Sequence, residues 1–218
     1  MKPIDRREAL GRLASVPFAL RFAFEAATVD AASKHAEGAL AAASKGEAYK
    51  PKFFTAHEWE TVKVLVDLII PKDERSGSAT DAGVPEFMDF IMIDPMENDR
   101  GREWRQTGMR GGLAWLDAEC EKRFQTTFME ATDANRKAFL DEISKATGED
   151  DDEDVQPQDL RVRFRHGPSF FSSFRDLTAS GFWSSKMGVQ DLGYQGNTYV
   201  AEWKGCPPEA LKKLGLEA

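Results

Sequence analysis

Hydrophobic side chains recur at helical spacing in several separate stretches of the chain. The clearest stretch begins after Thr55-Ala56-His57-Glu58, which has the form of a capping box. In this motif a threonine hydroxyl and a glutamate carboxylate each bond a backbone N–H of the first helical turn. Apolar residues follow three and four positions apart, and the pattern stops at Pro71, which cannot continue a helix. The apolar positions are Trp59, Val62, Leu65, Val66 and Ile69, widened by Val64, Leu68 and Ile70. The sequence therefore predicts a strongly buried helix here.

Four later stretches predict further helices. One opens at Gly83 and Pro85 and another at Pro168, because proline is well tolerated in a first helical turn. Thr132 is placed to cap a third, and the fourth begins at Leu113. The inward positions are Phe87, Met88, Phe90, Ile91 and Met92; Leu113, Leu116, Cys120 and Phe124; Phe139, Leu140 and Ile143; and Phe170, Phe174, Leu177 and Gly181.

The segments between these helices predict loops. Residues 94–112 are charged and contain glycine, so we expect a loop with a turn at Asp94-Pro95. The tail from Ser184 onward is rich in glycine, tyrosine and asparagine, with a short helix expected after Pro207-Pro208. Because no run alternates apolar and polar residues as a strand would, the predicted fold is all-α. It is an irregular bundle of about five helices with long loops and a Gly/aromatic-rich C-terminal tail.

The first 45 residues differ from the rest of the chain. A basic start contains the adjacent pair Arg6–Arg7 followed by Leu10, then come a moderately apolar middle and a small-residue end. This layout is typical of an export signal, and the arginine pair resembles the twin-arginine type. Small residues at Ala39-Leu40-Ala41 or Ala41-Ala42-Ala43 offer cleavage sites. The alternative is an N-terminal helix that stays attached and lies on a partner.

The chain therefore divides into three parts. Residues 1–45 form the signal or N-terminal helix, residues 46–52 a linker, and residues 53–218 the helical domain.

The formal net charge is -8, and six consecutive acids lie at positions 149–154. An acidic chain with no basic stripe is a poor nucleic-acid binder, because such binding depends on neutralising phosphates. The acidic run is most simply a solvated loop, since six like charges repel one another.

The two cysteines, Cys120 and Cys206, are far apart in the sequence. They form no CxxC pair, which argues against a zinc site or an iron–sulfur cluster. No CxxCH motif is present, so the sequence gives this chain no c-type haem of its own. If the protein is exported, the two thiols are able to form one disulfide; the alternative is two free thiols.

The sequence offers no catalytic constellation. The histidines are His35, His57 and His166, and HExxH would need a second histidine at position 61, where Thr61 stands. No GxSxG elbow, GxGxxG turn or phosphate loop is present. We therefore expect no catalytic, cofactor-binding or metal-binding residues in this chain.

Aromatic residues are frequent in the C-terminal third. Trp183, Tyr194, Asn197, Tyr199 and Trp203 lie in or beside a segment too polar and glycine-rich to form a regular element. Tyrosine and tryptophan are enriched at protein interfaces. These five residues are therefore our candidates for contact with a larger partner.

Several motifs in this order resemble one family. They are FTAHEW at 54–59, LIIPKD at 68–73, DAGVPEF at 81–87, GGLAWLD at 111–117, the spaced FF, LT and GF pairs within 170–182, YQGN at 194–197 and WKG at 203–205. Together they resemble the gluconate 2-dehydrogenase subunit 3 family over about residues 53–215. No single motif is diagnostic, but the ordered set is fairly specific.

This resemblance implies an accessory subunit of a dehydrogenase complex in the periplasm, at the cytoplasmic membrane. A large GMC-type subunit would carry FAD and the substrate site, and a cytochrome c subunit would carry haem. The small subunit would stabilise and escort the large one through twin-arginine export, with Arg6 and Arg7 in that role. The family supplies no catalytic residues to transfer. Two alternatives stay open: a structural subunit of another membrane assembly anchored by an uncleaved N-terminal helix, and a stand-alone ligand-binding protein.

Overall fold

The structure is a computed structural model that describes residues 26–94, 99–145, 167–194, 205–206 and 208–213. Its elements are the helices α2 (Ala26–Ala43), α3 (Ala56–Ile69), α4 (Val84–Met92), α5 (Asp99–Phe124), α6 (Asp133–Lys145), α8 (Gly167–Ser184), α9 (Lys186–Asp191) and α10 (Pro208–Lys213). The described residues contain no strand, and the predicted all-α class is confirmed. The short helix expected after Pro207-Pro208 is α10.

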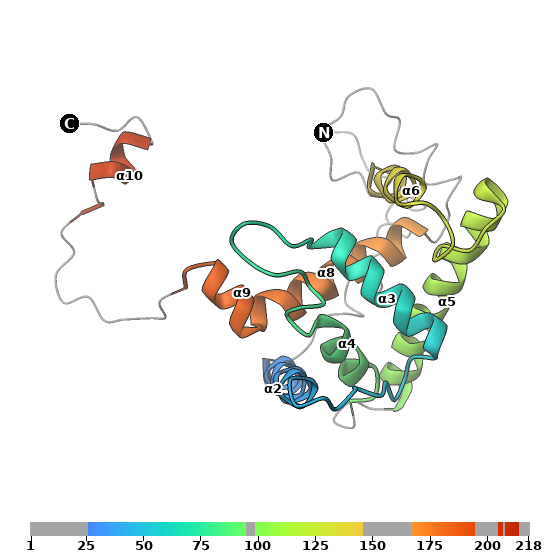
Figure 1. Ribbon diagram of the computed structural model, residues 1–218, viewed down its shortest axis with the longest axis horizontal. Coiled ribbons are helices and arrows are strands. Elements are labelled where there is room, and N and C mark those ends of the chain that lie inside the picture. The colour runs from blue at the N-terminus through green and yellow to red at the C-terminus, as the bar shows by residue number, and fades with distance from the viewer. Residues whose placement is uncertain (1–25, 95–98, 146–166, 195–204, 207, 214–218) are drawn as a thin grey trace, which may run out of the picture.

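The short helix α4 lies at the centre of the bundle. Helices α2, α3, α5 and α8 all pack against it (Figure 1). Seven of its nine residues are buried, including Phe87, Met88 and Ile91. Burial of each such side chain contributes about 1.5–3 kcal/mol to folding. The predicted helix opening is confirmed, because Gly83 is the N-cap residue and Pro85 lies in the first turn.

The start of α3 follows its predicted capping box. Thr55 Oγ1 accepts from the Glu58 backbone N–H at 3.3 Å, and the Thr55 backbone N–H donates to Glu58 Oε2 at 2.8 Å. The helix then buries Val62, Leu65 and Val66 and ends at Ile69, before Pro71. Local sequence alone therefore determines both ends of this helix.

The prediction of a loop at residues 94–112 is wrong over most of its length. Helix α5 begins at Asp99 and runs without a break through Gly101, Gly108, Gly111 and Gly112. Glycine destabilises an isolated helix, so the sequence favoured a loop. In the folded protein α5 packs against α3, α4 and α8, and this tertiary packing offsets the poor propensity.

The expectation of an irregular tail from Ser184 also needs correction. Ser185 caps a short helix, α9, by accepting from the Gly188 backbone N–H at 3.0 Å. Gly188 permits the tight turn from α8 into α9, because a β-carbon there would lie 2.1 Å from the Phe182 carbonyl oxygen. Residues 184–194 therefore form part of an α8–α9 corner rather than an irregular tail.

The predicted linker at residues 46–52 is held by a buried carboxylate. Asp89 on α4 is 0% exposed and accepts from the backbone N–H groups of Lys52 at 2.8 Å and Phe53 at 2.9 Å. It also accepts from the Phe54 N–H at 3.3 Å and the Tyr49 hydroxyl at 2.9 Å. Burial and the neighbouring Asp89 carboxylate raise the pKa of Tyr49. The approach to α3 is therefore fixed from within the core rather than being a free spacer.

Candidate functional site

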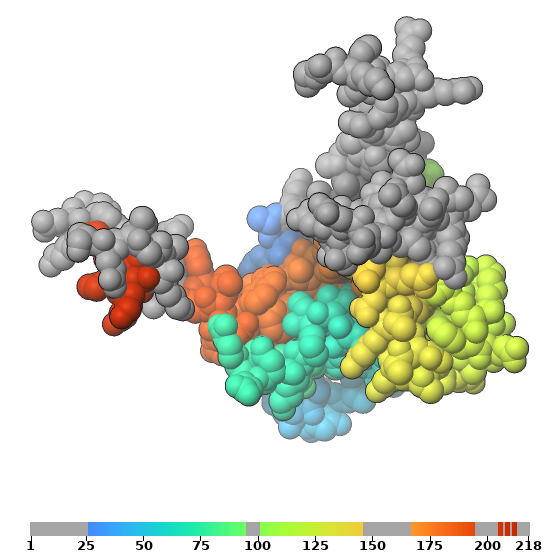
Figure 2. Space-filling model, turned by 90° about the horizontal axis from the view of Figure 1, so that it is seen from above, coloured from blue at the N-terminus to red at the C-terminus, as the bar shows by residue number. Residues whose placement is uncertain are grey.

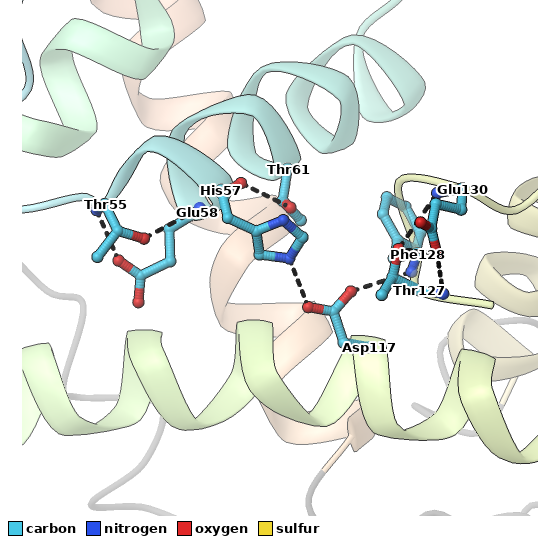
Figure 3. A network of polar contacts seen from close by, with 8 residues as sticks. All are labelled: Thr55, His57, Glu58, Thr61, Asp117, Thr127, Phe128 and Glu130. Carbon is cyan, nitrogen blue, oxygen red and sulfur yellow. Dashed lines mark hydrogen bonds and ion pairs between the residues drawn. The ribbon is translucent and has the colours of Figure 1, made fainter.

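A polar network joins the start of α3 to the middle of α5 and to the turn between α5 and α6 (Figure 3). His57 Nε2 lies 2.6 Å from Asp117 Oδ2. The second oxygen of the same carboxylate, Oδ1, accepts from the Phe128 backbone N–H at 3.0 Å. Asp117 thus connects α5 both to the start of α3, which is distant in the sequence, and to the turn that follows α5. Phe128, which it positions, is fully buried.

The threonine hydroxyls in this network form hydrogen bonds within their own turns. Thr61 Oγ1 donates to the His57 carbonyl oxygen at 3.0 Å (Figure 3). Thr127 Oγ1 donates to Glu130 Oε2 at 3.0 Å, and the Thr127 backbone N–H reaches the same oxygen at 3.2 Å. Each threonine therefore stabilises its own turn.

The His57–Asp117 pair resembles the base and orienting acid of a catalytic triad, but the described residues give it no nucleophile. A triad needs a hydroxyl or thiol within hydrogen-bond reach of the histidine. The only side-chain contact recorded for the His57 ring among the described residues is Asp117. The described residues also contain no group of three or more His, Cys, Asp or Glu side chains arranged to hold a metal ion. The chemistry that this geometry supports is structural: it locks α3, α5 and the α5–α6 turn together.

The second feature is the α8–α9 corner, which carries exposed apolar side chains. Trp183 is 42% exposed, Leu192 62% and Tyr194 58%. The Trp183 ring packs edge-on against buried Phe182, with ring centroids 5.0 Å apart. Figure 1 shows α9 at one side of the bundle and α5 at the other, and the space-filling view agrees (Figure 2). These three exposed side chains belong to the last turn of α8 and to the residues directly after α9, and we call them the aromatic corner.

The aromatic corner is held from two sides by ion pairs and side-chain packing. Arg75, in the loop after α3, bonds the Asp191 carbonyl and lies 3.1 Å from the Asp191 carboxylate. On the other side Lys186 Nζ lies 2.7 Å from Glu37 Oε2 of α2. Met187 packs on the core beneath. The exposed side chains are thus presented on a fixed backbone.

Of the five predicted partner-contact residues, the structure describes two. Trp183 and Tyr194 are both exposed at the aromatic corner. Asn197, Tyr199 and Trp203 lie outside the described residues, as do Arg6, Arg7 and Leu10 of the predicted signal and the acidic run at 149–154.

The structure shows the two cysteines unpaired, and the disulfide raised from the sequence stays a prediction. Cys120 and Cys206 are both free, with Cys120 buried on α5 and Cys206 exposed. Burial raises the pKa of the Cys120 thiol to about 11, which makes it a poor nucleophile near neutral pH. Cys120 is therefore a core residue, as its place in the apolar stripe of α5 predicted.

Sequence reasoning missed three of these residues. Asp89 carries a detectable signal, because a carboxylate between Met88 and Phe90 in an apolar run needs buried hydrogen-bond donors. Asp117 gives no such signal, since His57 is distant in the sequence and Phe128 contributes only a backbone N–H. Leu192 is ordinary in the sequence and becomes notable only through its exposure.

Among the residues that the structure describes, no helix has both the length and the apolar character needed to cross a bilayer.

The fold and site define a helical domain with a buried central helix, a structural His–Asp pair and an exposed aromatic corner. The chain matches the family model of gluconate 2-dehydrogenase subunit 3 over residues 56–201. Because this match covers more than half of the chain, the protein belongs to the gluconate 2-dehydrogenase subunit 3 family. Searches of curated proteins and of solved structures each found no match.

Proposed function

We propose that this protein is the non-catalytic small subunit of a periplasmic, membrane-associated dehydrogenase complex that oxidises a gluconate-, alcohol- or sugar-type substrate. The observation that carries the proposal is family membership across residues 56–201, from the start of α3 to beyond α9. In this proposal a large GMC-type subunit carries FAD and the substrate site, and a cytochrome c subunit carries haem. This chain stabilises the large subunit and escorts it through twin-arginine export.

The aromatic corner supports the proposal that this chain functions by binding a larger partner protein. Exposed apolar side chains that form a contiguous patch are typical of interaction sites, and our proposal is that the aromatic corner forms such a patch. Tryptophan and tyrosine contribute most per residue at interfaces, because they bury a large area with little loss of conformational entropy. Trp183 and Tyr194 are of this kind, and Leu192 lies between them in the chain.

Co-purification tests the docking surface. We expect the tagged wild-type chain to recover a flavin-containing oxidoreductase, detected by flavin absorbance and dye-linked dehydrogenase activity. The double variant Trp183→Ala with Tyr194→Ala should recover at least tenfold less flavin, since each lost hot-spot residue costs about 2 kcal/mol of binding free energy. Unchanged recovery by the double variant would show that the corner is not the docking surface.

The matched control is Trp104→Ala. Trp104 is 51% exposed on α5, and Figure 1 shows helix α5 on the opposite side of the bundle from α9. This variant should recover as much flavin as the wild type. Thermal melts of both variants show whether they are folded. A wild-type chain that recovers no flavoprotein from its own host would contradict the proposed function as a whole.

Export has a separate test. Replacing the arginine pair, Arg6→Lys with Arg7→Lys, should leave both this chain and the large subunit in the cytoplasm, because twin-arginine recognition depends on the pair. The measurement is immunoblotting of periplasmic and cytoplasmic fractions. A large subunit that still reaches the periplasm rules out the escort role.

A further inference from the structure

Helix α2 has the packing of a permanent core element. It packs chiefly against α4 and also against α8. Ala32 is 0% exposed and Ala36 4% exposed on its inner face. Gly83, at the N-cap of α4, has a φ of 79° and lies directly beneath α2. A β-carbon on Gly83 would lie 3.1 Å from Leu40 Cδ1 and 3.3 Å from Ala36 Cβ, so the two helices meet at close range.

Polar contacts tie α2 to separate parts of the chain. Ser33 Oγ donates to Ser184 Oγ of α8 at 2.8 Å. Glu37 pairs with Lys186 of α9 at 2.7 Å.

Nearer the middle of α2, His35 contacts the segment that leads into α3. Its Nε2 atom lies 3.2 Å from the Tyr49 hydroxyl. Its ring also packs against Phe90 of α4, with centroids 5.0 Å apart. Together with Ser33 and Glu37, it connects α2 to α4, α8, α9 and the approach to α3.

These contacts argue against cleavage of an export signal within α2. The two cleavage sites that the sequence offers, at residues 39–41 and 41–43, lie inside α2, in its last turns. Proteolysis favours exposed, extended chain ends and loop tips, whereas the backbone here is helical. Cleavage at either site would also remove Ala32, Ser33, His35 and Ala36, and leave Gly83 and Phe90 without their packing partners.

We infer that residues 26–43 remain in the mature protein as a structural helix, so that any removal of an export signal takes place before Ala26. Helix α2 lies outside the stretch that matches the family, so the inference rests on its own contacts. It does not depend on the identity of the partner or on the export route.

The first test is the N-terminus of the protein recovered from its native host. Intact mass and N-terminal peptide sequencing should place the start at or before Ala26. A start at any later residue would overturn the inference. A protein that keeps Met1 also satisfies this test, because it retains Ala26–Ala43. The export role is tested separately by the Arg6→Lys, Arg7→Lys variant, so its failure is distinguishable from failure of this inference.

The second test uses two substitutions on opposite faces of α2. Ala36→Gln places a larger polar side chain in the contact with Gly83, whereas Ala31→Gln changes an exposed position outside both candidate cleavage sites. In the mature protein we expect Ala36→Gln to lower the Tm by about 3–10 °C, as overpacking in a chain of this size does. Ala31→Gln should change the Tm by less than about 2 °C, as surface substitutions do.

The paired design makes the second result decisive. If the mature protein lacks α2, both variants give the same mature chain and melt together, which would overturn the inference. If Ala36→Gln does not accumulate but Ala31→Gln does, the milder Ala36→Ser replaces it. If the Tm of Ala36→Ser equals the Tm values of the wild type and of Ala31→Gln, that result also counts against the inference.

Discussion

The aromatic ring of Phe170 on α8 occupies the space that a side chain on Gly112 of α5 would need. A β-carbon built on Gly112 would lie 1.9 Å from Phe170 Cδ2. The same contact recurs in reverse nearby, where a β-carbon on Gly167 of α8 would lie 2.1 Å from Trp115 Cη2 of α5. In each helix, an aromatic ring from the other helix packs directly against the backbone of a glycine. This exchange sets how closely α5 and α8 approach.

Substitution of Gly112 tests this contact. We expect Gly112→Ala to lower the free energy of unfolding by at least about 1–3 kcal/mol, because the added methyl group forces the Phe170 ring out of its place. Gly111→Ala is the matched control, since a β-carbon there meets nothing within 4 Å. It should raise the stability by roughly 0.5–1 kcal/mol, as Gly→Ala does in a helix. Urea unfolding followed by circular dichroism measures both, and equal midpoints would refute the contact.

Removal of the Asp89 carboxylate should be among the most damaging single changes. Asp89→Ala leaves three backbone N–H groups and the Tyr49 hydroxyl without their acceptor. Each buried donor that loses its acceptor lowers the free energy of unfolding by about 1–3 kcal/mol. Tyr49→Phe is the control, because it removes one donor and keeps the carboxylate bonded to the backbone. In thermal melts we expect Asp89→Ala to lower the Tm more than Tyr49→Phe does. The reverse order would mean that Asp89 does not organise the approach to α3.

His35 should make the stability depend on pH in the acidic range. Burial, together with the positive charge of Lys52, lowers the pKa of His35 below its ordinary 6.5, although Asp89 opposes this. The unfolded chain then binds more protons than the folded one between the two pKa values, so stability is full above pH 6.5 and falls as the pH drops through the folded pKa. Unfolding of the wild type and of His35→Gln at a series of pH values measures this. The wild type should lose more stability on acidification, and parallel curves would contradict the prediction.

The two cysteines should react at different rates. In the native protein we expect an aromatic disulfide reagent at pH 8 to modify only the exposed Cys206, because Cys120 is buried and burial raises its pKa to about 11. Both thiols should react after unfolding in guanidinium chloride. Cys206→Ser should abolish the fast native reaction, and Cys120→Ser should leave it intact. If neither thiol reacts after unfolding without a reductant, the chain carries the disulfide that the structure lacks.

Local sequence predicted the elements whose signals lie within a single turn. The capping box at Thr55 and Glu58 and the stop before Pro71 place α3 correctly, and Gly83 with Pro85 marks the start of α4. The candidate site was predicted less completely. The tail aromatics pointed to Trp183 and Tyr194, but nothing local separated Leu192 from a core leucine.

The sequence by itself determined the all-α class, the apolar faces of the helices and the family, because these depend on periodicity and on ordered short motifs. Only the tertiary structure decided that α5 continues through its glycines, that α2 packs on α4, and that Asp117 links His57 to Phe128. The physical reason is that each of these depends on groups distant in the chain. A glycine that breaks an isolated helix is favourable when an aromatic ring from another helix fills the space above it.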